Sequence, residues 1–338
     1  MKLAIAILNW NGLSHLQTFL PSVVEYSTEH SIYLIDNAST DNSVAWVTKT
    51  YPQVSIIVNA QNGGFCKGYN DGLKQIEAEF FVLLNSDVEV TANWLNPILS
   101  ILENDPKVAA VQPKILSYLQ KNTFEYAGAA GGYLDWLGYP FCRGRIFDSV
   151  EKDENQYNDT TEIFWASGAC MFIRASLFSE LGGFDEAFFA HMEEIDLCWQ
   201  LKNKGYKIMY TGESKVYHLG GGTLQKTNVF KTYLNYRNGL FLLYKNLPKK
   251  RLFSTILIRL VLDGISGARH LLRFEFSFIL AIIKAHFSFY SIIFKGKVAR
   301  INHTNFETSP ILYRSVVWEY FAKGKKVYSD LINLEKQN

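Results

Sequence analysis

The sequence has 338 residues, of which 20% are charged, and a formal net charge of +2 at pH 7. This length suits one large domain or a domain with an appendage, and so small a net charge gives no reason to expect nucleic acid as a partner. The four cysteines show neither the CxxC spacing of a zinc site nor the density of a disulfide scaffold, which favours a reducing, cytoplasmic compartment.

Short apolar runs and helical patterns alternate through the first part of the chain. Strands are predicted at residues 3–8, 32–35, 54–58, 80–84 and 108–111, and helices at residues 13–26, 43–50, 67–76 and 94–102. The repeated order of strand, helix and strand predicts an α/β fold, Rossmann-like, with a mostly parallel sheet flanked by helices. Neither the glycine-rich dinucleotide fingerprint nor a P-loop occurs in the sequence.

Polar side chains follow four of these strands where each strand ends, at residues 9–12, 36–41, 59–65 and 85–87. Because the carboxyl ends of parallel strands share one sheet edge, these clusters predict a binding crevice. Each cluster also has a plainer interpretation, since Asn, Asp, Ser and Gly form turns and cap helices. That interpretation does not explain why the second and fourth strands both lead into an aspartate, Asp36 and Asp87.

The fourth strand, residues 80–84, is wholly apolar and runs directly into Asn85, Ser86 and Asp87. An aspartate there can hold a divalent cation that in turn holds a phosphate. The alternative is an aspartate that caps the next helix. Since the chain lacks a phosphate-cradling loop, a bound nucleotide diphosphate would need a metal at Asp87 to neutralise it.

The second half of the chain places three acids, Glu193, Glu194 and Asp196, at the start of a predicted helix. Glu194 precedes the apolar Leu197 and Cys198 by three and four positions, so it projects from the same inward face. An acid there is placed to meet a substrate. The alternative is a first-turn glutamate that only complements the helix dipole.

Several segments together form an ordered set of motifs. They are AIAILNWNG at 4–12, LIDNASTD at 34–41, NGGF at 62–65, LLNSD at 83–87, GGFDE at 182–186 and EEIDL at 193–197. This set resembles the inverting family 2 glycosyltransferases of the GT-A fold, in their bacterial rhamnosyltransferase-like branch. The resemblance covers residues 1–240 and divides them into a nucleotide-sugar half, 1–116, and an acceptor half, 117–240.

The resemblance implies a donor site in the first half. Asp36 would contact the nucleotide base, Asn9 and Asn62 would lie near base and ribose, and Asp87 would bind the metal. The further donor-binding residues it implies are Asn11, Gly64, Asn85 and Ser86. The family often has Asp-x-Asp at the metal, whereas this chain has Asn85 first. An amide oxygen binds a hard cation less strongly than a carboxylate, so Asn85 is expected to contact sugar or ribose.

The resemblance also assigns residues in the acceptor half. Glu194 takes the position of the general base, as a Glu in place of the usual Asp, and Asp196 remains its rival or braces a neighbouring side chain. The residues implied on the acceptor side are Trp165, Gly168 and Glu193. His218 looks like the family's metal-binding histidine, although a lone histidine after a strand is more often a hydrogen-bonded surface residue. A carboxylate with an imidazole suits Mg²⁺ or Mn²⁺.

The composition changes towards the C-terminus, and residues 241–338 are predicted to form a helical region. Its apolar segments contain charges, so no stretch reaches the roughly 18 uncharged apolar residues of a membrane-spanning helix. Basic clusters at 249–251 and 295–300 flank aromatic-rich helices, which predicts peripheral contact with the inner face of the cell membrane. The alternative is a helical subdomain that packs on the catalytic domain or in a homo-oligomer.

Together with these observations, the resemblance implies a metal-dependent inverting glycosyltransferase of cell-envelope polysaccharide synthesis. It would move a sugar from a nucleotide-diphosphate sugar to a hydroxyl of a glycan or lipid-linked glycan. One rival is a nucleotidyltransferase, which should carry a glycine- and basic-rich loop after its first strand. The other is a catalytically inactive sugar-nucleotide-binding or scaffold protein, against which Asp87, Glu194 and His218 argue. The sugar, the nucleotide and the acceptor stay open at this point.

Overall fold

The computed structural model describes residues 1–220, 228–296, 298–301 and 311–332. Two glycines that follow His218 in the sequence, Gly221 and Gly222, lie outside these residues, as does Lys297 of the C-terminal basic cluster.

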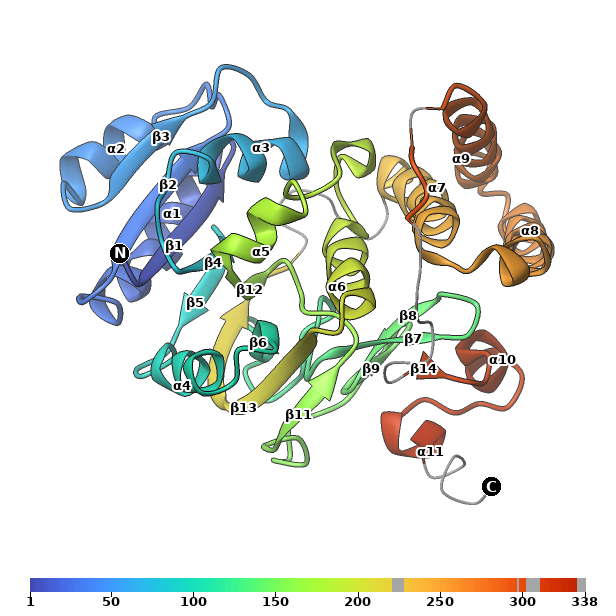
Figure 1. The fold of residues 1–338 in the computed structure, drawn as a ribbon. Helices are drawn as coiled ribbons and strands as arrows, with labels where there is room; N and C mark the ends of the chain where they lie inside the picture. Colours follow the sequence, from blue (N-terminus) through green and yellow to red (C-terminus); the bar gives the residue numbers. More distant parts are fainter. Residues whose placement is uncertain (221–227, 297, 302–310, 333–338) are drawn as a thin grey trace.

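A nine-stranded sheet forms the centre of the described structure, in the order β11-β13-β6-β12-β4-β1-β2-β3 with β5 paired to β13 (Figure 1). Its strands are β1 (Leu3–Asn9), β2 (Ser31–Asp36), β3 (Ser55–Val58), β4 (Phe80–Asn85), β5 (Val88–Val90), β6 (Val108–Ser117), β11 (Thr160–Ile163), β12 (Cys170–Arg174) and β13 (Lys207–His218). The predicted α/β fold is confirmed, because β1 to β4 pair in parallel, as do β6 and β13. Strand β12 enters antiparallel between β4 and β6.

Helices cover both faces of this sheet, as alternate residues of β1 show. Leu3, Ile5 and Ile7 pack in the same core as α1 and α4, whereas Ala4 and Ala6 pack in the core that contains α3 and α6. The helices are α1 (Leu13–Glu25), α2 (Ser43–Thr50), α3 (Gly64–Leu73), α4 (Asn96–Asn104), α5 (Ala175–Glu180), the short 3₁₀ helix η1 (Glu186–Phe188) and α6 (Glu193–Asn203). Burial of both strand faces explains the continuous apolar runs of the sequence.

A second sheet of five strands, which the sequence analysis did not predict, lies beside the first. Its strands are β7 (Gly132–Asp135), β8 (Pro140–Cys142), β9 (Arg145–Ile146), β10 (Ser149–Val150) and β14 (Ile311–Leu312), and α10 (Val316–Phe321) and α11 (Tyr328–Ile332) follow β14. The backbone N–H of Gly132 donates to Trp165 O over 3.1 Å, and Trp165 Nε1 donates to Tyr133 O over 3.1 Å. The segment before β12 is therefore bonded to β7.

Three long helices, α7 (Val229–Asn246), α8 (Lys249–Leu272) and α9 (Phe276–Phe294), stack at one end of the molecule, with α7 next to α6 (Figure 1). The basic residues at 249–251, expected between helices, form the first turn of α8 instead. Helix α9, with 19 residues and a mean hydropathy of 1.7, is long and apolar enough to cross a membrane by length and composition, and Lys284 interrupts it as the sequence predicted.

All four cysteines are free and buried: Cys66, Cys142, Cys170 and Cys198.

Substitution of Gly132 should show how tightly the two sheets are joined. A Cβ at Gly132 would lie 2.1 Å from Cε2 of the buried Trp165 ring. We expect Gly132→Ala to lower the free energy of unfolding by about 1–3 kcal/mol through overpacking, measured by urea denaturation of the full chain.

Gly264→Ala is the matched control. Gly264 lies within α8, and no atom lies within 4 Å of the added Cβ. Alanine favours a helix interior over glycine by about 0.5–1 kcal/mol, so this variant should be as stable as the wild type or more so. Equal stability of Gly132→Ala and the wild type would contradict the close packing at Trp165.

Candidate functional site

Hydrogen bonds join the polar ends of β1 and β2. Parallel pairing sets Asn9 opposite Asp36, and Asn9 Nδ2 donates to Asp36 Oδ1 over 2.9 Å and to Ser43 Oγ over 2.9 Å. The backbone N–H of Ser39 donates to Asp36 Oδ2 over 2.9 Å. The structure thus brings the predicted donor residues Asn9 and Asp36 into direct contact, with both side chains buried.

The end of β4 lies next to the joined ends of β1 and β2. A Cβ at Gly12 would lie 2.5 Å from Asn9 Oδ1 and 3.6 Å from Ser86 Oγ, so Ser86 is a neighbour of the β1 end. Asn11 has a left-handed backbone (φ 51°), and its Oδ1 accepts a hydrogen bond from the backbone N–H of Thr40 over 2.7 Å. The side chain of Asn11 therefore fixes the turn after β2.

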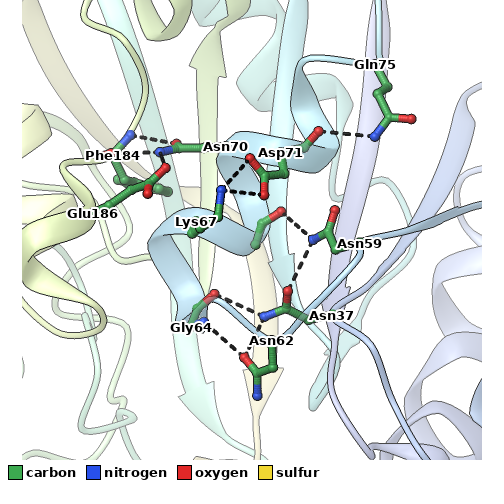
Figure 2. Close-up of polar contacts among 11 residues, drawn as sticks. Asn37, Asn59, Asn62, Gly64, Lys67, Asn70, Asp71, Gln75, Phe184 and Glu186 are labelled. Atoms are coloured by element: carbon green, nitrogen blue, oxygen red, sulfur yellow. Dashed lines mark hydrogen bonds and ion pairs between the residues drawn. The ribbon is translucent and has the colours of Figure 1, made fainter.

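An amide network holds the start of α3, as Figure 2 shows. Asn37 Nδ2 donates to Asn62 Oδ1 over 2.9 Å and to Gly64 O over 3.1 Å, and Asn59 Nδ2 donates to Asn37 Oδ1 over 3.2 Å. Asn62 Oδ1 also accepts from the backbone N–H of Gly64 over 2.9 Å. Helix α3 therefore starts at Gly64, earlier than the predicted residue 67, and both Asn62 and Gly64 lie at its first turn.

Asp87 and His218 meet at the ends of β4 and β13. Antiparallel pairing of β13 with β5 sets His218 opposite Val88. His218 Nε2 lies 3.1 Å from Asp87 Oδ1 and 3.4 Å from Asn85 Nδ2. Asp87 is 7% exposed and His218 is 5% exposed, so this histidine is a buried member of the site and not a surface residue.

Glu125, which the sequence analysis did not select, faces the other ring nitrogen of His218. Its Oε2 lies 3.2 Å from His218 Nδ1, an ion-pair contact without aligned hydrogen-bond geometry. A Cβ at Gly220 would lie 2.5 Å from Glu125 Oε1, so Gly220 covers this carboxylate. No local pattern marks Glu125, because it lies in the connection between β6 and β7.

In the cluster of Asp87, His218 and Glu125, the imidazolium and the two carboxylates stabilise one another's charged forms. Burial acts to lower the pKa of His218, but the Asp87 and Glu125 carboxylates raise it to about 10. Burial likewise acts to raise the pKa of Asp87, and the histidine outweighs it and brings that pKa below its ordinary value. The pKa of Glu125 is lowered in the same way, against burial, by its contact with His218.

The same residues fit a divalent cation. A carboxylate and an imidazole lie side by side in Asp87 and His218, and Glu125 on the far ring nitrogen is the kind of partner that orients a metal-binding histidine. No group of three or more His, Cys, Asp or Glu able to hold a metal occurs in the described ranges. Two protein ligands are nevertheless enough when substrate phosphates and water complete the shell, as is usual for Mg²⁺.

The three acids at the start of α6 have different surroundings. Asp196 is 1% exposed, and its carboxylate accepts hydrogen bonds from Lys245 Nζ over 2.7 Å, from Gln200 Nε2 over 2.8 Å and from Asn246 Nδ2. Burial raises the pKa of Asp196, and Lys245 opposes that rise. Because both carboxylate oxygens are occupied within the protein, Asp196 ties α6 to α7.

Glu194 is less buried than Glu193 and Asp196. Its side chain is half-buried, its Oε2, like that of Glu193, is buried and has no hydrogen-bond partner, and burial raises the pKa of Glu194 to about 7. Glu193 is only 4% exposed, and burial together with the Glu194 charge raises its pKa well above the ordinary value. Its burial leaves Glu193 little surface with which to touch an acceptor.

A short segment before β12 links Glu194 to the end of β4. A Cβ at Gly168 would lie 4.0 Å from Glu194 Cβ, and the next residue, Ala169, accepts a hydrogen bond at its carbonyl from the backbone N–H of Asn85 over 3.0 Å. Trp165, also predicted on the acceptor side, is 4% exposed and packs against β7. Gly168 therefore lies between the two predicted halves of the site.

The loop just before α6 has an unusual backbone. Phe189, His191 and Met192 have φ values of 65°, 68° and 75°, a region in which a residue with a side chain is strained by about 1–3 kcal/mol. Met192 is the N-cap residue of α6. Such strain persists only where neighbouring groups hold the chain in place.

Two helices hold this loop. From α7, Asn238 Nδ2 lies 2.9 Å from Phe188 O, 2.8 Å from Ala190 O and 2.8 Å from His191 O, in donor geometry. From α3, the backbone N–H of Phe65 donates to Phe189 O over 3.1 Å. The loop that leads into Glu194 is thus fixed from both sides, and no local sequence pattern indicates the role of Asn238.

The sequence is similar to a family of known proteins and to individual relatives. The sequence profile of the family described as Glycosyl transferase family 2 matches residues 4–182, more than half of the 338-residue chain. An N-acetylglucosaminyl-diphospho-decaprenol L-rhamnosyltransferase of Mycobacterium tuberculosis is 26% identical over 236 residues, which cover 64% of this chain and 75% of that protein. The O-antigen biosynthesis protein RfbC of Myxococcus xanthus is 31% identical over 156 residues, which cover 44% of this chain and 12% of that protein.

The fold is also similar to solved structures. GalNAc-T7, solved with UDP, GalNAc and Mn²⁺, aligns with a TM-score of 0.52 at 19% identity, over 64% of this chain and 43% of that chain. At this identity the likeness concerns the fold alone.

Asn238→Asp should loosen the loop before α6. The change keeps the shape of the side chain but sets a carboxylate against three carbonyl oxygens, and we expect the free energy of unfolding to fall by about 1–3 kcal/mol. Hydrogen exchange should show faster exchange of the backbone amides of 187–192. Asn104→Asp on the exposed surface of α4 is the isosteric control, and equal protection of the loop in both variants would contradict the role given to Asn238.

Proposed function

The chain belongs to glycosyl transferase family 2, and from this membership we propose that it is a metal-dependent inverting enzyme using a nucleotide-diphosphate sugar. The acceptor we propose is a hydroxyl of a glycan or lipid-linked glycan. One observation carries the proposal: Glu194, with an unpartnered buried oxygen and a pKa raised to about 7, lies across Gly168 and Ala169 from the end of β4, where Asp87 meets His218.

The donor would lie along the carboxyl ends of β1, β2 and β4, in the half that ends at residue 116. We assign the nucleotide base to the place where β1 and β2 end, which Asp36 shapes through its bonds to Asn9 and Ser39, and the ribose and sugar to the region of Asn62 and Asn85. The Mycobacterium tuberculosis relative is named for transfer of L-rhamnose to N-acetylglucosaminyl-diphospho-decaprenol. That name supports an activated rhamnose and a lipid-linked acceptor as the first substrates to test.

In the proposed reaction, the acceptor hydroxyl attacks the anomeric carbon from the face opposite the diphosphate. Glu194 takes the hydroxyl proton as the new C–O bond forms, and the bonding electrons of the old C–O bond pass to the departing diphosphate. A divalent cation bound at Asp87 and His218 would supply positive charge beside that diphosphate. Glu125 would keep the imidazole of His218 turned towards Asp87.

Of the two candidates for the general base, we propose Glu194. We propose that Asp196 instead holds α6 against α7. Both oxygens of Asp196 already accept hydrogen bonds from α6 and α7, whereas one oxygen of Glu194 has none. We also propose that the enzyme acts on the cytoplasmic side of the membrane, which the four free cysteines support.

Glu194→Gln should remove the base and leave the donor site intact. We expect kcat to fall by about 10²–10⁴-fold while calorimetry shows unchanged affinity for the donor. Because burial raises the pKa of Glu194 to about 7 and the base works as the carboxylate, wild-type kcat should fall about tenfold per pH unit below that pKa and level off above it. The residual activity of the variant should lack this inflection.

Glu180→Gln, which removes an exposed carboxylate of α5, is the matched control and should turn over like the wild type. Normal turnover by Glu194→Gln would disprove the assignment of the base. Tight donor binding by the wild type without turnover of any sugar nucleotide would instead favour the inactive binding protein.

The effect of a metal ion on donor binding should depend on Asp87 and its neighbours. We expect Mn²⁺ to strengthen donor binding to the wild type in calorimetry, and Asp87→Ala to abolish that effect. Glu125→Gln removes the negative charge beside His218, and we expect it to reduce the gain in donor affinity that Mn²⁺ gives by about 10–100-fold. Asp148→Asn, on an exposed turn, is the control, and a full Mn²⁺ effect in Asp87→Ala would rule out the ligand assignment.

A further inference from the structure

The hairpin of α8 and α9 exposes large apolar side chains on its outer face. Five of them are at least 74% exposed: Phe253, Leu272, Phe274, Phe287 and Phe294. On α8 the exposed apolar residues recur every four positions from Phe253 through Leu257 and Val261 to Ile265, so they form one stripe along the helix. Single exposed apolar residues are ordinary, but many large exposed apolar side chains on two helices that pack together mark a surface for a partner.

The charged groups of this hairpin are strongly one-sided. Residues 249–296 contain eight Lys and Arg against two acids, Asp263 and Glu275. Both acids are paired inside the hairpin: Asp263 Oδ2 lies 3.1 Å from His286 Nε2, and Glu275 Oε2 lies 2.6 Å from His270 Nδ1. The exposed charges are all cations: Lys249, Lys250, Arg269, Arg273, Lys284 and Lys295.

The placement of cations at the start of α8 points to an anionic partner. Lys249 and Lys250 lie in the first turn, which contains no acid. A helix N-terminus carries a partial positive charge, so cations there are unfavourable in isolation and become favourable when anions approach. Arg251 in the same turn is bonded to Trp136 O over 3.0 Å, which leaves the two exposed lysines to meet such a partner.

We propose that the α8–α9 hairpin docks on the surface of an anionic lipid bilayer. Its apolar stripe would lie at the boundary of headgroups and acyl chains, and its exposed lysines and arginines would contact lipid phosphates. A second copy of the chain is a less suitable partner for the hairpin, because a symmetric contact between two hairpins would set one cationic face against another.

The packing of α9 favours a helix that lies on the bilayer over one that crosses it. Its inner side contacts α7, where Phe289 meets Phe241 and Tyr233 Oη donates to Ser288 Oγ over 2.9 Å. Its His286 is paired with the buried Asp263 of α8. A crossing helix would have to leave both contacts, so α9 stays with the folded protein and offers only its outer face.

Flotation of the full chain with lipid vesicles tests the docking without any donor or acceptor, so its outcome is separate from that of the proposed transferase. We expect the wild type to float with phosphatidylcholine–phosphatidylglycerol vesicles at low salt, and more weakly with phosphatidylcholine alone. Phe253→Ser and Phe287→Ser should each lower the partition coefficient by about tenfold. Lys249→Glu with Lys250→Glu should weaken binding to the anionic vesicles only.

Leu119→Ser is the matched control, since Leu119 and Phe287 are both 74% exposed and Leu119 lies outside the hairpin. This variant should float like the wild type. Equal flotation of Phe287→Ser and the wild type would overturn the proposal. So would a dimer in light scattering that Phe287→Ser dissociates while no vesicle binds, and so would resistance of the bound protein to alkaline carbonate extraction, which indicates a spanning helix.

Discussion

The antiparallel ladder between β13 and β5 is the contact on which the site depends. It carries His218 to Asp87, although 131 positions separate them in the chain. The insertion of β12 between β4 and β6 has a matching effect, because it sets Ala169 beside Asn85 and Gly168 beside Glu194. Residues from both halves of the chain therefore lie together at the end of the buried strand β4.

The features that local chemistry dictates could be predicted from the sequence. The wholly apolar run before Asn85 is a strand buried on both faces, and the acids Glu193, Glu194 and Asp196 lie in the first turn of a helix. Glu125 and Asn238 were missed because their roles come from contacts across the fold, to His218 and to the loop before α6. The second sheet was missed because its strands of two to four residues are too short to show periodicity.

Helix α7 joins the two regions for which we make proposals. Towards α6 it presents Asn238 to the strained loop and Lys245 to Asp196, and on its other side it packs against α8 and α9. Two carboxyl groups that lie two positions apart also differ in their hydrogen bonding. Asp196 accepts hydrogen bonds from α7, while Glu194 keeps an oxygen without a partner. Such unequal surroundings are how proteins give similar acids different tasks.

Every cysteine of this chain is buried, and burial makes the four thiols unreactive. A thiol reacts as its thiolate, and burial raises the pKa of Cys198 to about 12 and the pKa of Cys66, Cys142 and Cys170 as well. The native thiols are thus both shielded and protonated. A maleimide dye should therefore attach at one engineered surface cysteine alone, so fluorescence could follow the polarity around any chosen position without removing a natural residue from the core.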